Sequence, residues 1–428
     1  MADEGTPPAK RRTYTGWRVV GANSVVWSLQ SMVWVQGFGN LAVELRDQFG
    51  WSKTFLSVVF GATRAEIALI GPAQGRAIQR RGVTRIMRTG AVASAIGFVA
   101  VALIDTRLEF FLAMLLLAIG MSLVGFLTIS AATVVWFEKR RARALSIQTM
   151  GFAIGGFAAP VMVWGFQEIG WRSTVLIVGG LLSSAAWWAA GISGRRPEDT
   201  GEPMDGLSER EAAGTPEAEG LATRHLTARE AIRTRSFWMI SFGHAFALLV
   251  VVSSMAHLAL YLTEDRGYSA GSAAVAAGIV PLVQIVGTAA GGYLGDRMNK
   301  RVISGVAMQL HGAALLTLVW VDAGYAVVVF IVLHGFAWGV RGPQMQAIRA
   351  DYFGSTSFAT IMGWSNIIVT MGAIAGPVIA GTLADATGDY RLGFTILGFA
   401  AASGTVFWVF ATPPTVGLDD AVPPPGDA

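Results

Sequence analysis

Long apolar segments recur along the whole chain and constrain its fold more than any other feature of the sequence. Each holds roughly 20 or more mostly apolar residues, enough for a helix that rises 1.5 Å per residue to cross about 30 Å of hydrocarbon. One water-soluble core could not bury so many. We therefore expect twelve transmembrane helices, near residues 17–43, 54–78, 84–104, 108–136, 143–168, 172–193, 237–262, 271–295, 302–321, 324–349, 356–384 and 391–411.

The composition agrees with an all-α membrane protein. Hydrophobic residues make up 53% of the 428 residues and charged residues 14%, whereas about a quarter of the residues are charged in ordinary soluble proteins. The 14 Trp and 52 Gly also fit, because Trp gathers at membrane interfaces and Gly is frequent in membrane helices. The absence of Cys excludes disulfides and thiolate metal sites.

The distribution of Lys and Arg predicts the orientation in the membrane. Alternate loops hold clustered cations, and cytoplasmic loops are the ones enriched in Lys and Arg. Both termini should therefore be cytoplasmic, in an inner (plasma) membrane. The clusters can also touch anionic lipids, and we do not interpret them as a nucleic-acid site. They comprise Lys10, Arg11 and Arg12; Arg80, Arg81 and Arg85; Lys139, Arg140, Arg141 and Arg143; and Arg297, Lys300 and Arg301.

The spans divide the chain into two six-helix bundles, residues 17–193 and 237–411. A cytoplasmic tail, 1–16, precedes the first bundle, and another, 412–428, follows the second. The apolar stretch that starts at Trp17 is too long for the apolar region of a signal peptide, so we expect it to be retained. Residues 194–236 between the bundles are charged and rich in Pro, Gly, Glu and Ala, which predicts a solvated cytoplasmic linker.

The two bundles are related by an internal repeat. Because six is an even number, two six-helix units run in the same orientation, and parallel repeats of this kind characterise one transporter architecture. Several landmarks recur at a single offset of 217 positions: Gly75 with Gly292, Arg80 with Arg297, and Pro160 with Pro377.

Over essentially the whole chain, these features resemble the major facilitator superfamily. The family's loop between spans 2 and 3 reads Gly-x-x-x-Asp-Arg-x-Gly-x-Arg. Residues 75–85 read Gly-Arg-Ala-Ile-Gln-Arg-Arg-Gly-Val-Thr-Arg, with Gln79 in place of the Asp, and Asp296-Arg297 keeps the pair in the second half. Within the superfamily, Phe-Gly-Trp-Ser at 49–52 and Trp-Phe-Glu-Lys-Arg-Arg at 136–141 are most similar to the monocarboxylate and oxalate:formate transporters.

The resemblance implies transport by alternating access between the two bundles, with spans 1, 4, 7 and 10 lining a central cavity. Members of that subfamily hold the substrate carboxylate with a cation in span 8 or span 11. Here 271–295 and 356–384 contain no Lys or Arg, so the resemblance does not supply the binding site. For gating we propose Gly75, Arg80, Asp296, Arg297, Pro160 and Pro377.

Ionisable residues deep in a span are the main functional candidates, since burying a charge in lipid costs several kcal/mol. Arg64 and Glu66 lie in span 2 and Arg341 lies in span 10. Arg64 and Glu66 are about 200° apart on a helix and do not form a same-face pair. The three charges leave one surplus positive charge, which an anionic substrate would neutralise. Glu66 is the candidate proton carrier. Interhelical charge pairing is the structural alternative for each residue.

Two polar and aromatic stripes extend these candidates to a substrate site. Both have helical intervals of four and three residues, and polar groups on a membrane helix face protein or water. Rings with a few hydrogen-bonding groups suit a small ligand with an apolar body and a polar head. Packing seams between helices are the alternative. The stripes are Asn23, Trp27, Gln30 and Trp34 in span 1, and His334, Trp338, Arg341 and Met345 in span 10.

The sequence therefore predicts a secondary active transporter that moves a small organic anion, and we favour a monocarboxylate with protons as a candidate coupling ion. No Walker motif, catalytic constellation or metal-ligand spacing was found, so we expect no enzyme activity, no cofactor and a monomer. Efflux of an amphipathic drug or metabolite is the first alternative, and a membrane sensor on a transporter fold is a remote one. Substrate identity, direction and coupling ion stay open.

Overall fold

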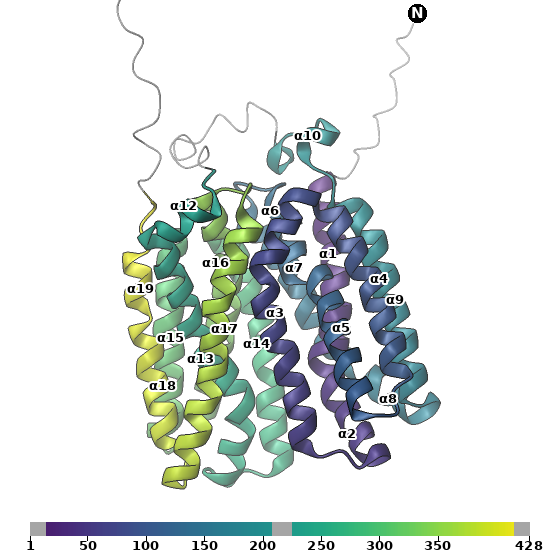
Figure 1. The fold of residues 1–428 in the computed structure, drawn as a ribbon. Helices are drawn as coiled ribbons and strands as arrows, with labels where there is room; N and C mark the ends of the chain where they lie inside the picture. The colour runs from purple at the N-terminus through teal and green to yellow at the C-terminus, as the bar shows by residue number, and fades with distance from the viewer. Residues whose placement is uncertain (1–13, 208–224, 415–428) are drawn as a thin grey trace, which may run out of the picture.

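A computed structural model describes residues 14–207 and 225–414. The fold is built from membrane-length helices (Figure 1). Within these residues, eleven helical segments are long and apolar enough to cross a membrane. They are α3 (Lys53–Arg81), α4 (Val83–Ala102), α5 with α6 (Arg107–Val124 and Phe126–Val134), α7 with α8 (Arg141–Phe157 and Ala159–Ile169), α9 (Trp171–Ser193), α13 (Arg235–Glu264), α14 (Ala270–Gly295), α15 (Lys300–Trp320), α16 (Tyr325–Phe353), α17 (Phe358–Thr387), and α18 with α19 (Arg391–Ser403 and Thr405–Phe410).

The eleven segments correspond to the second to twelfth predicted spans. The first predicted span, 17–43, falls on three consecutive elements: α1 (Thr15–Gln30), the π-helix η1 (Ser31–Gly37) and α2 (Phe38–Phe49). The count of twelve spans therefore stays a prediction. The predicted span 1 stripe crosses from α1 into this π-helix, since Trp34 lies in η1 and the other three members lie in α1.

The same turn starts the second span of each half, 217 residues apart. Gly50 and Gly267 have positive φ values of 64° and 67°, a conformation that only Gly adopts at little cost. Two residues later, Ser52 and Ser269 cap α3 and α14, each accepting a hydrogen bond from a backbone amide of the first turn. Because a Ser oxygen satisfies an amide that the helix itself leaves free, these residues set where both helices begin.

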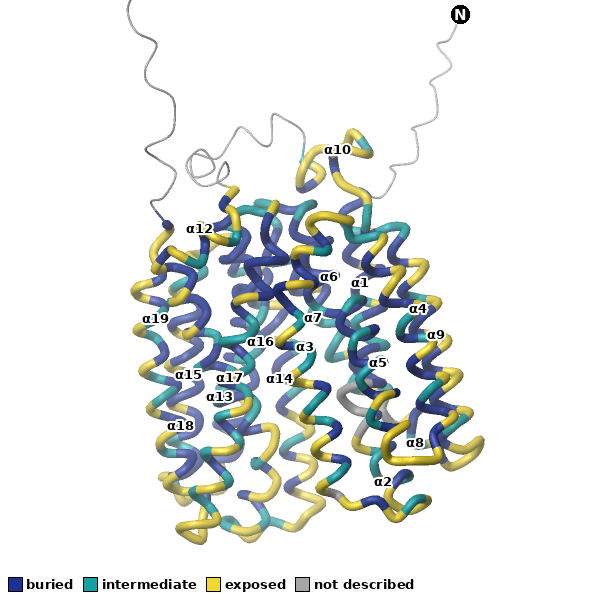
Figure 2. Tube along the Cα trace, viewed as in Figure 1, coloured by how far each residue is buried: buried dark blue, intermediate teal, exposed yellow. Residues whose placement is uncertain are grey.

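The helices form two groups, a first half (α1–α9) and a second half (α13–α19), packed side by side (Figure 1). Short elements of the predicted linker lie at one end of the bundle, which we call the linker end: α10 (Pro197–Thr200), η2 (Met204–Gly206) and α12 (Ala228–Arg233). Figure 2 shows exposed positions along the outer face of α9. The exposed apolar side chains of this helix are Leu176, Ile177, Leu181, Trp187 and Trp188.

Close helix contacts repeat at the offset found in the sequence. A Cβ added to Gly155 of α7 would lie 2.0 Å from the carbonyl oxygen of Ser28 in α1. A Cβ added to Gly372 of α17 would lie 2.2 Å from the carbonyl oxygen of Ala245 in α13. Each residue of the second pair lies 217 positions after its counterpart. Glycine thus allows the same close approach of two helices in both halves.

Candidate functional site

The two halves meet at the linker end through two equivalent glycine contacts. A Cβ on Gly75 of α3 would lie 2.5 Å from the Cα of Thr360 in α17, and one on Gly292 of α14 would lie 3.1 Å from the Cα of Arg143 in α7. Both residues of the second contact are offset by 217 from their counterparts. A shared apolar cluster surrounds these contacts, with residues of both halves such as Ile78, Leu145, Ala347 and Met362. The backbones of the two halves therefore touch directly at this end.

Asp296 adds a polar contact between the halves, at the start of α7. Its Oδ1 accepts hydrogen bonds from the backbone amides of Ala142, at 2.9 Å, and Arg143, at 3.3 Å. A helix N-terminus attracts a carboxylate because its amides are unpaired and its dipole is positive there. Burial nevertheless raises the pKa of Asp296 to about 6, so these contacts offset only part of the cost of desolvating the carboxylate.

Gln79 occupies the equivalent position in the first half and contacts the start of α17. Its Nε2 donates to the Ser357 hydroxyl at 3.3 Å, and its Oε1 accepts from the Thr360 hydroxyl at 3.2 Å. The two halves thus hold each other through a matched pair of contacts, a carboxylate on one side and a neutral amide on the other. The neutral side lacks the charge–dipole attraction that Asp296 has.

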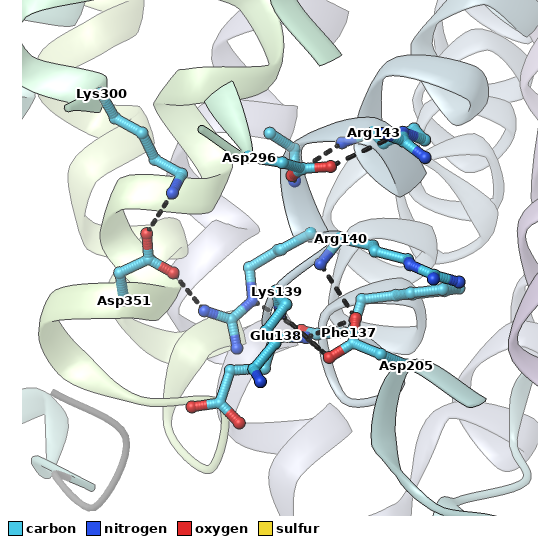
Figure 3. Close-up of polar contacts among 11 residues, drawn as sticks. Phe137, Glu138, Lys139, Arg140, Arg143, Asp205, Asp296, Lys300 and Asp351 are labelled. Carbon is cyan, nitrogen blue, oxygen red and sulfur yellow. Dashed lines mark hydrogen bonds and ion pairs between the residues drawn. The ribbon is translucent and has the colours of Figure 1, made fainter. Parts of the chain in front are cut away.

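An ion-pair network lies beside these contacts (Figure 3). Arg141 of the first half pairs with Asp351 of α16, whose second oxygen lies 2.9 Å from Nζ of Lys300. Asp205 of the linker holds the neighbouring loop: its carboxylate accepts hydrogen bonds from the backbone amides of Lys139 and Arg140, each at 2.9 Å. The linker therefore supports the backbone that presents Arg141 to the second half.

The six predicted gating residues separate into two groups. Gly75 and Asp296 lie in contacts between the halves, as described above. Arg80 is exposed, Pro160 is exposed at the start of α8, and Arg297 lies over the ring of Tyr293 in its own half. The carbonyl oxygen of Pro377 lies 3.1 Å from His257 Nε2, also within one half. A gating role for all six stays a prediction, and the contacts favour the first two.

Replacing Gly75 with Val should loosen the linker end. The new side chain would overlap the backbone of α17, and overpacking of this kind costs typically 1–3 kcal/mol. A cysteine introduced at Ser357, which is 4% exposed, should then react on the order of tenfold faster with a soluble thiol reagent. The chain has no other cysteine to confuse the readout. Gly61→Val is the control, since a Cβ at Gly61 meets nothing within 4 Å. If the introduced cysteine reacts at the same rate in the Gly75→Val and Gly61→Val variants, Gly75 does not keep the linker end closed.

In the second half, α16 carries two buried guanidinium groups, Arg341 and Arg349, each 1% exposed. Nε and Nη1 of Arg341 are buried without a hydrogen-bond partner. Within 14–207 and 225–414, no Asp or Glu forms an ion pair with either group. A buried charge is costly unless it is paired. Both guanidinium groups are therefore buried without a described carboxylate partner.

Arg349 is a residue that the sequence analysis missed, because it lay at the predicted end of span 10. The helix continues to Phe353, which places Arg349 inside the bundle. Its Nη2 donates to the Ser365 hydroxyl of α17 at 2.6 Å, and that hydroxyl lies 2.8 Å from the hydroxyl of Ser241 in α13. The spacing of eight residues from Arg341, two turns along one helix, is the sequence signal that could have identified it.

His244 of α13 completes this polar cluster. Its ring is buried, and Nδ1 has no hydrogen-bond partner in the described part of the chain. His244 lies one turn after Ser241 on the same helix. We call Arg341, Arg349, His244, Ser241 and Ser365 the arginine cluster. These residues come from three helices of the second half, α13, α16 and α17. Two of their donors, Nε and Nη1 of Arg341, have no hydrogen-bond partner in the described part of the chain.

His334 and Trp338 of the span 10 stripe precede Arg341 on α16 and lie farther from the linker end. His334 is buried, its Nδ1 lies 3.1 Å from Nδ1 of His311, and its ring stacks on Phe330 at 4.8 Å. Trp338 is half-buried and packs against the apolar core of the second half. Both therefore have protein contacts of their own, and a role in substrate binding stays a prediction for each.

The span 1 stripe connects helices of the first half. Asn23 donates to the carbonyl of Ile129 and accepts from Ser193, and Gln30 donates to the carbonyl of Met121 at 2.7 Å. These contacts favour the packing alternative for both residues. The ring of Trp27 lies 5.6 Å from that of Phe126 and 5.2 Å from that of Phe152. The side chain of Trp34 lies outside the described part of the structure.

Arg64 and Glu66 do not pair with each other, in agreement with their predicted separation around the helix. Arg64 is exposed, and its guanidinium lies 4.9 Å from the centre of the Phe60 ring. Both carboxylate oxygens of Glu66 are buried without a hydrogen-bond partner among the described residues. Glu66 is thus a carboxyl group at membrane depth that no described cation neutralises. In the same residues, no group of three or more His, Asp or Glu could hold a metal ion.

Comparisons with known proteins agree with this architecture. The family model described as Major Facilitator Superfamily matches residues 23–322 and 240–425. Monocarboxylate transporter 13 of Rattus norvegicus is 26% identical over 328 residues, covering 76% of this chain and 72% of the relative. The gallate transporter of Pseudomonas putida is 27% identical over 397 residues, covering 86% of each. A crystal structure of the fucose:proton symporter of E. coli has a TM-score of 0.71 at 13% identity, covering 93% of this chain and 100% of the symporter.

Proposed function

Because the chain belongs to the major facilitator superfamily and is a multi-pass membrane transporter, we propose that it carries a small organic anion, a monocarboxylate, by secondary active transport. The observation that supports this substrate is the arginine cluster. Arg341 is a fully buried guanidinium at mid-membrane on α16, with unpaired donors and no described carboxylate beside it. A carboxylate would neutralise its charge and accept two of its hydrogen bonds at once.

The relatives support the same class of substrate. Two of them are named as transporters of a monocarboxylate and of gallate. Their names describe those proteins, and at 26–27% identity they leave the individual acid open for this chain. The relatives are transporters and not enzymes, which agrees with the lack of catalytic constellations in the sequence.

We further propose that transport proceeds by alternating access, and that the structure represents the state closed at the linker end. The glycine contacts, Asp296 and the Arg141–Asp351 pair would have to separate for the site to open there. In this proposal α1, η1 and α2 form the first of twelve spans, and the linker end faces the cytoplasm of a plasma-membrane protein.

The proposed orientation predicts the labelling of a cysteine placed at Glu198, which is exposed at the linker end. In intact cells this cysteine should be protected from a thiol reagent that cannot cross the membrane. Labelling of the cysteine would show that the linker end faces outward.

A thermal-shift screen of the purified protein tests the choice of an anion. Carboxylates should stabilise the folded protein, by about 2.7 kcal/mol at a concentration of 100 Kd, because a ligand stabilises the state that it binds. Primary amines with the same carbon skeletons should give no shift, since the cluster already carries uncompensated positive charge. Stabilisation by the amines and not by the acids would favour efflux of a cationic amphipathic compound instead.

A further inference from the structure

We propose that the two ends of the linker act as straps that position the Arg141–Asp351 pair, and that Asp205 is the residue through which the first strap does so. The straps are residues 195–207, which follow α9, and residues 225–234, which precede α13. The inference rests on the proposed function, in which this pair must separate for the linker end to open. It assigns the linker a part in keeping that end closed, beyond joining the two halves.

The two straps bind equivalent carbonyl groups of the internal repeat. In the first strap, the backbone amide of Asp205 donates to the carbonyl oxygen of Trp136 at 3.0 Å. In the second strap, the backbone amide of Leu226 donates to the carbonyl oxygen of Phe353, also at 3.0 Å. Trp136 and Phe353 are 217 positions apart, which is the offset that relates the two halves. Each half therefore holds one end of the linker at the same place.

Both carbonyl groups lie close along the chain to one member of the Arg141–Asp351 pair. Arg141 follows Trp136 by five residues, and its Nε donates to the carbonyl oxygen of Phe137 at 2.8 Å. Asp351 precedes Phe353 by two residues in the last turn of α16. The hydrogen bonds of the straps thus hold the backbone beside each member of the pair.

The side chain of Asp205 holds the loop before Arg141 more firmly than a neutral side chain could. Asp205 is 3% exposed. Its carboxylate accepts hydrogen bonds from the backbone amides of Glu138, at 3.1 Å, and of Lys139 and Arg140, each at 2.9 Å (Figure 3). Hydrogen bonds to a charged acceptor are roughly twice as strong as those between neutral groups. Three amides that converge on one carboxylate restrict the loop to the conformation that presents Arg141 to the second half.

The backbone of Asp205 is strained, and the contacts with the loop compensate for the strain. Asp205 has a φ of 58°, and within 14–207 and 225–414 it is the only residue other than Gly with a positive φ. This left-handed conformation costs free energy for a residue with a Cβ, and it persists where the surrounding contacts require it. Because Asn tolerates the conformation as Asp does, Asp205→Asn removes the negative charge and keeps the backbone.

Further contacts attach each strap to the half beside it in the chain. In the first strap, the Glu202 carboxylate accepts from the backbone amide of Thr15 at 2.8 Å and from its hydroxyl at 2.7 Å. In the second strap, Nδ1 of His225 lies 3.0 Å from Oγ1 of Thr356, and Leu226 is buried in the apolar core of the second half. Each strap can therefore move with its own half when the ion pair separates, so the straps act on the closure through that pair.

Thiol labelling of a cysteine introduced at Ser146 tests the proposal. Ser146 is 2% exposed in α7, and its Oγ lies 2.6 Å from the place that a Cβ on Gly292 would take, at the contact between the halves. Asp205→Asn should raise the labelling rate about fivefold or more, which is the lower end of a typical coupling between sites. Asp199→Asn is the matched control, because the Asp199 carboxylate accepts from the backbone amide of Arg196 within the same strap. The control should label at the wild-type rate.

A second substitution separates positioning of the ion pair from a general loss of structure. Asp351→Asn should speed labelling by itself, because it removes the negative member of the pair. Substitutions that act through one interaction are not additive. Adding Asp205→Asn to the Asp351 variant should therefore change the rate by less than about twofold. Glu202→Ala, which releases the first strap from α1, serves if the Asp205 variant does not fold, and its smaller acceleration should disappear in the same background.

The outcomes separate this inference from the proposed function, since labelling is measured without substrate. If Asp205→Asn labels at the wild-type rate, or if it speeds labelling by the same factor with and without Asp351→Asn, the strap does not position the pair and the inference is overturned. If Asp351→Asn by itself has no effect, the ion pair does not hold the linker end closed. The proposed closure then fails, and this inference fails with it.

Discussion

Arg341→Gln should abolish transport while the protein still reaches the membrane, and Arg341→Lys should weaken substrate binding by roughly 2 kcal/mol or more. The guanidinium is buried in α16, and Nε and Nη1 have no described partner. A planar fork of donors can hold both oxygens of a carboxylate, whereas an ammonium group keeps the charge and loses that geometry. The Lys variant therefore separates the geometry of binding from charge alone.

The measurement is substrate affinity of the purified variants beside the wild-type protein, by calorimetry, together with uptake in cells. Arg107→Lys is a matched control, because Arg107 is exposed at the start of α5 and far along the chain from the arginine cluster. It should bind and transport as the wild type does. Equal affinity in the Arg341→Lys variant would remove Arg341 from the site, and it would direct attention to Arg64 or to a substrate that is not an anion.

Glu66→Gln should abolish pH-driven accumulation of substrate and leave substrate exchange intact. Both carboxylate oxygens of Glu66 are buried without a described partner, and an unpaired carboxylate at membrane depth is costly in its charged form. A proton that binds and leaves with each cycle would remove that cost in one of the two states. Gln has the same shape and cannot carry the proton, so transport should continue only as exchange driven by the substrate gradient.

Accumulation in vesicles with an imposed pH gradient, compared with counterflow without a gradient, measures the two activities separately. Glu264→Gln is the control, since Glu264 is exposed at the end of α13, and it should keep both activities. If the Glu66 variant still accumulates substrate in response to the gradient, Glu66 has a structural role or another ion drives transport. Loss of both activities would instead indicate a folding or binding defect.

The candidate site could be predicted from the sequence only in part. Arg341 stands out because it interrupts a long apolar segment, so composition alone identifies it. Arg349 does not stand out in this way, because hydropathy falls gradually toward the end of a helix. The predicted end of span 10 was residue 349, whereas α16 continues to Phe353. Asn23 and Gln30 show a different limit of sequence patterns. Periodicity placed them on one face, but it could not say that neighbouring helices of the same half would satisfy their amides.

What the sequence alone determined follows from local properties of the chain. The length of each apolar segment sets the eleven membrane-length helical segments found in the described residues. Glycine and serine at a repeated offset set the matching turns at Gly50 and Gly267. Only the tertiary structure decided which helices meet. Gly75 and Thr360 are far apart in sequence, and they meet because the missing side chain of Gly75 lets the two backbones pack closely. Asp296 and Ala142 are also far apart, and they meet because the first backbone amides of a helix lack partners within that helix. Such pairings depend on the shape of both partners, and no single segment carries that information.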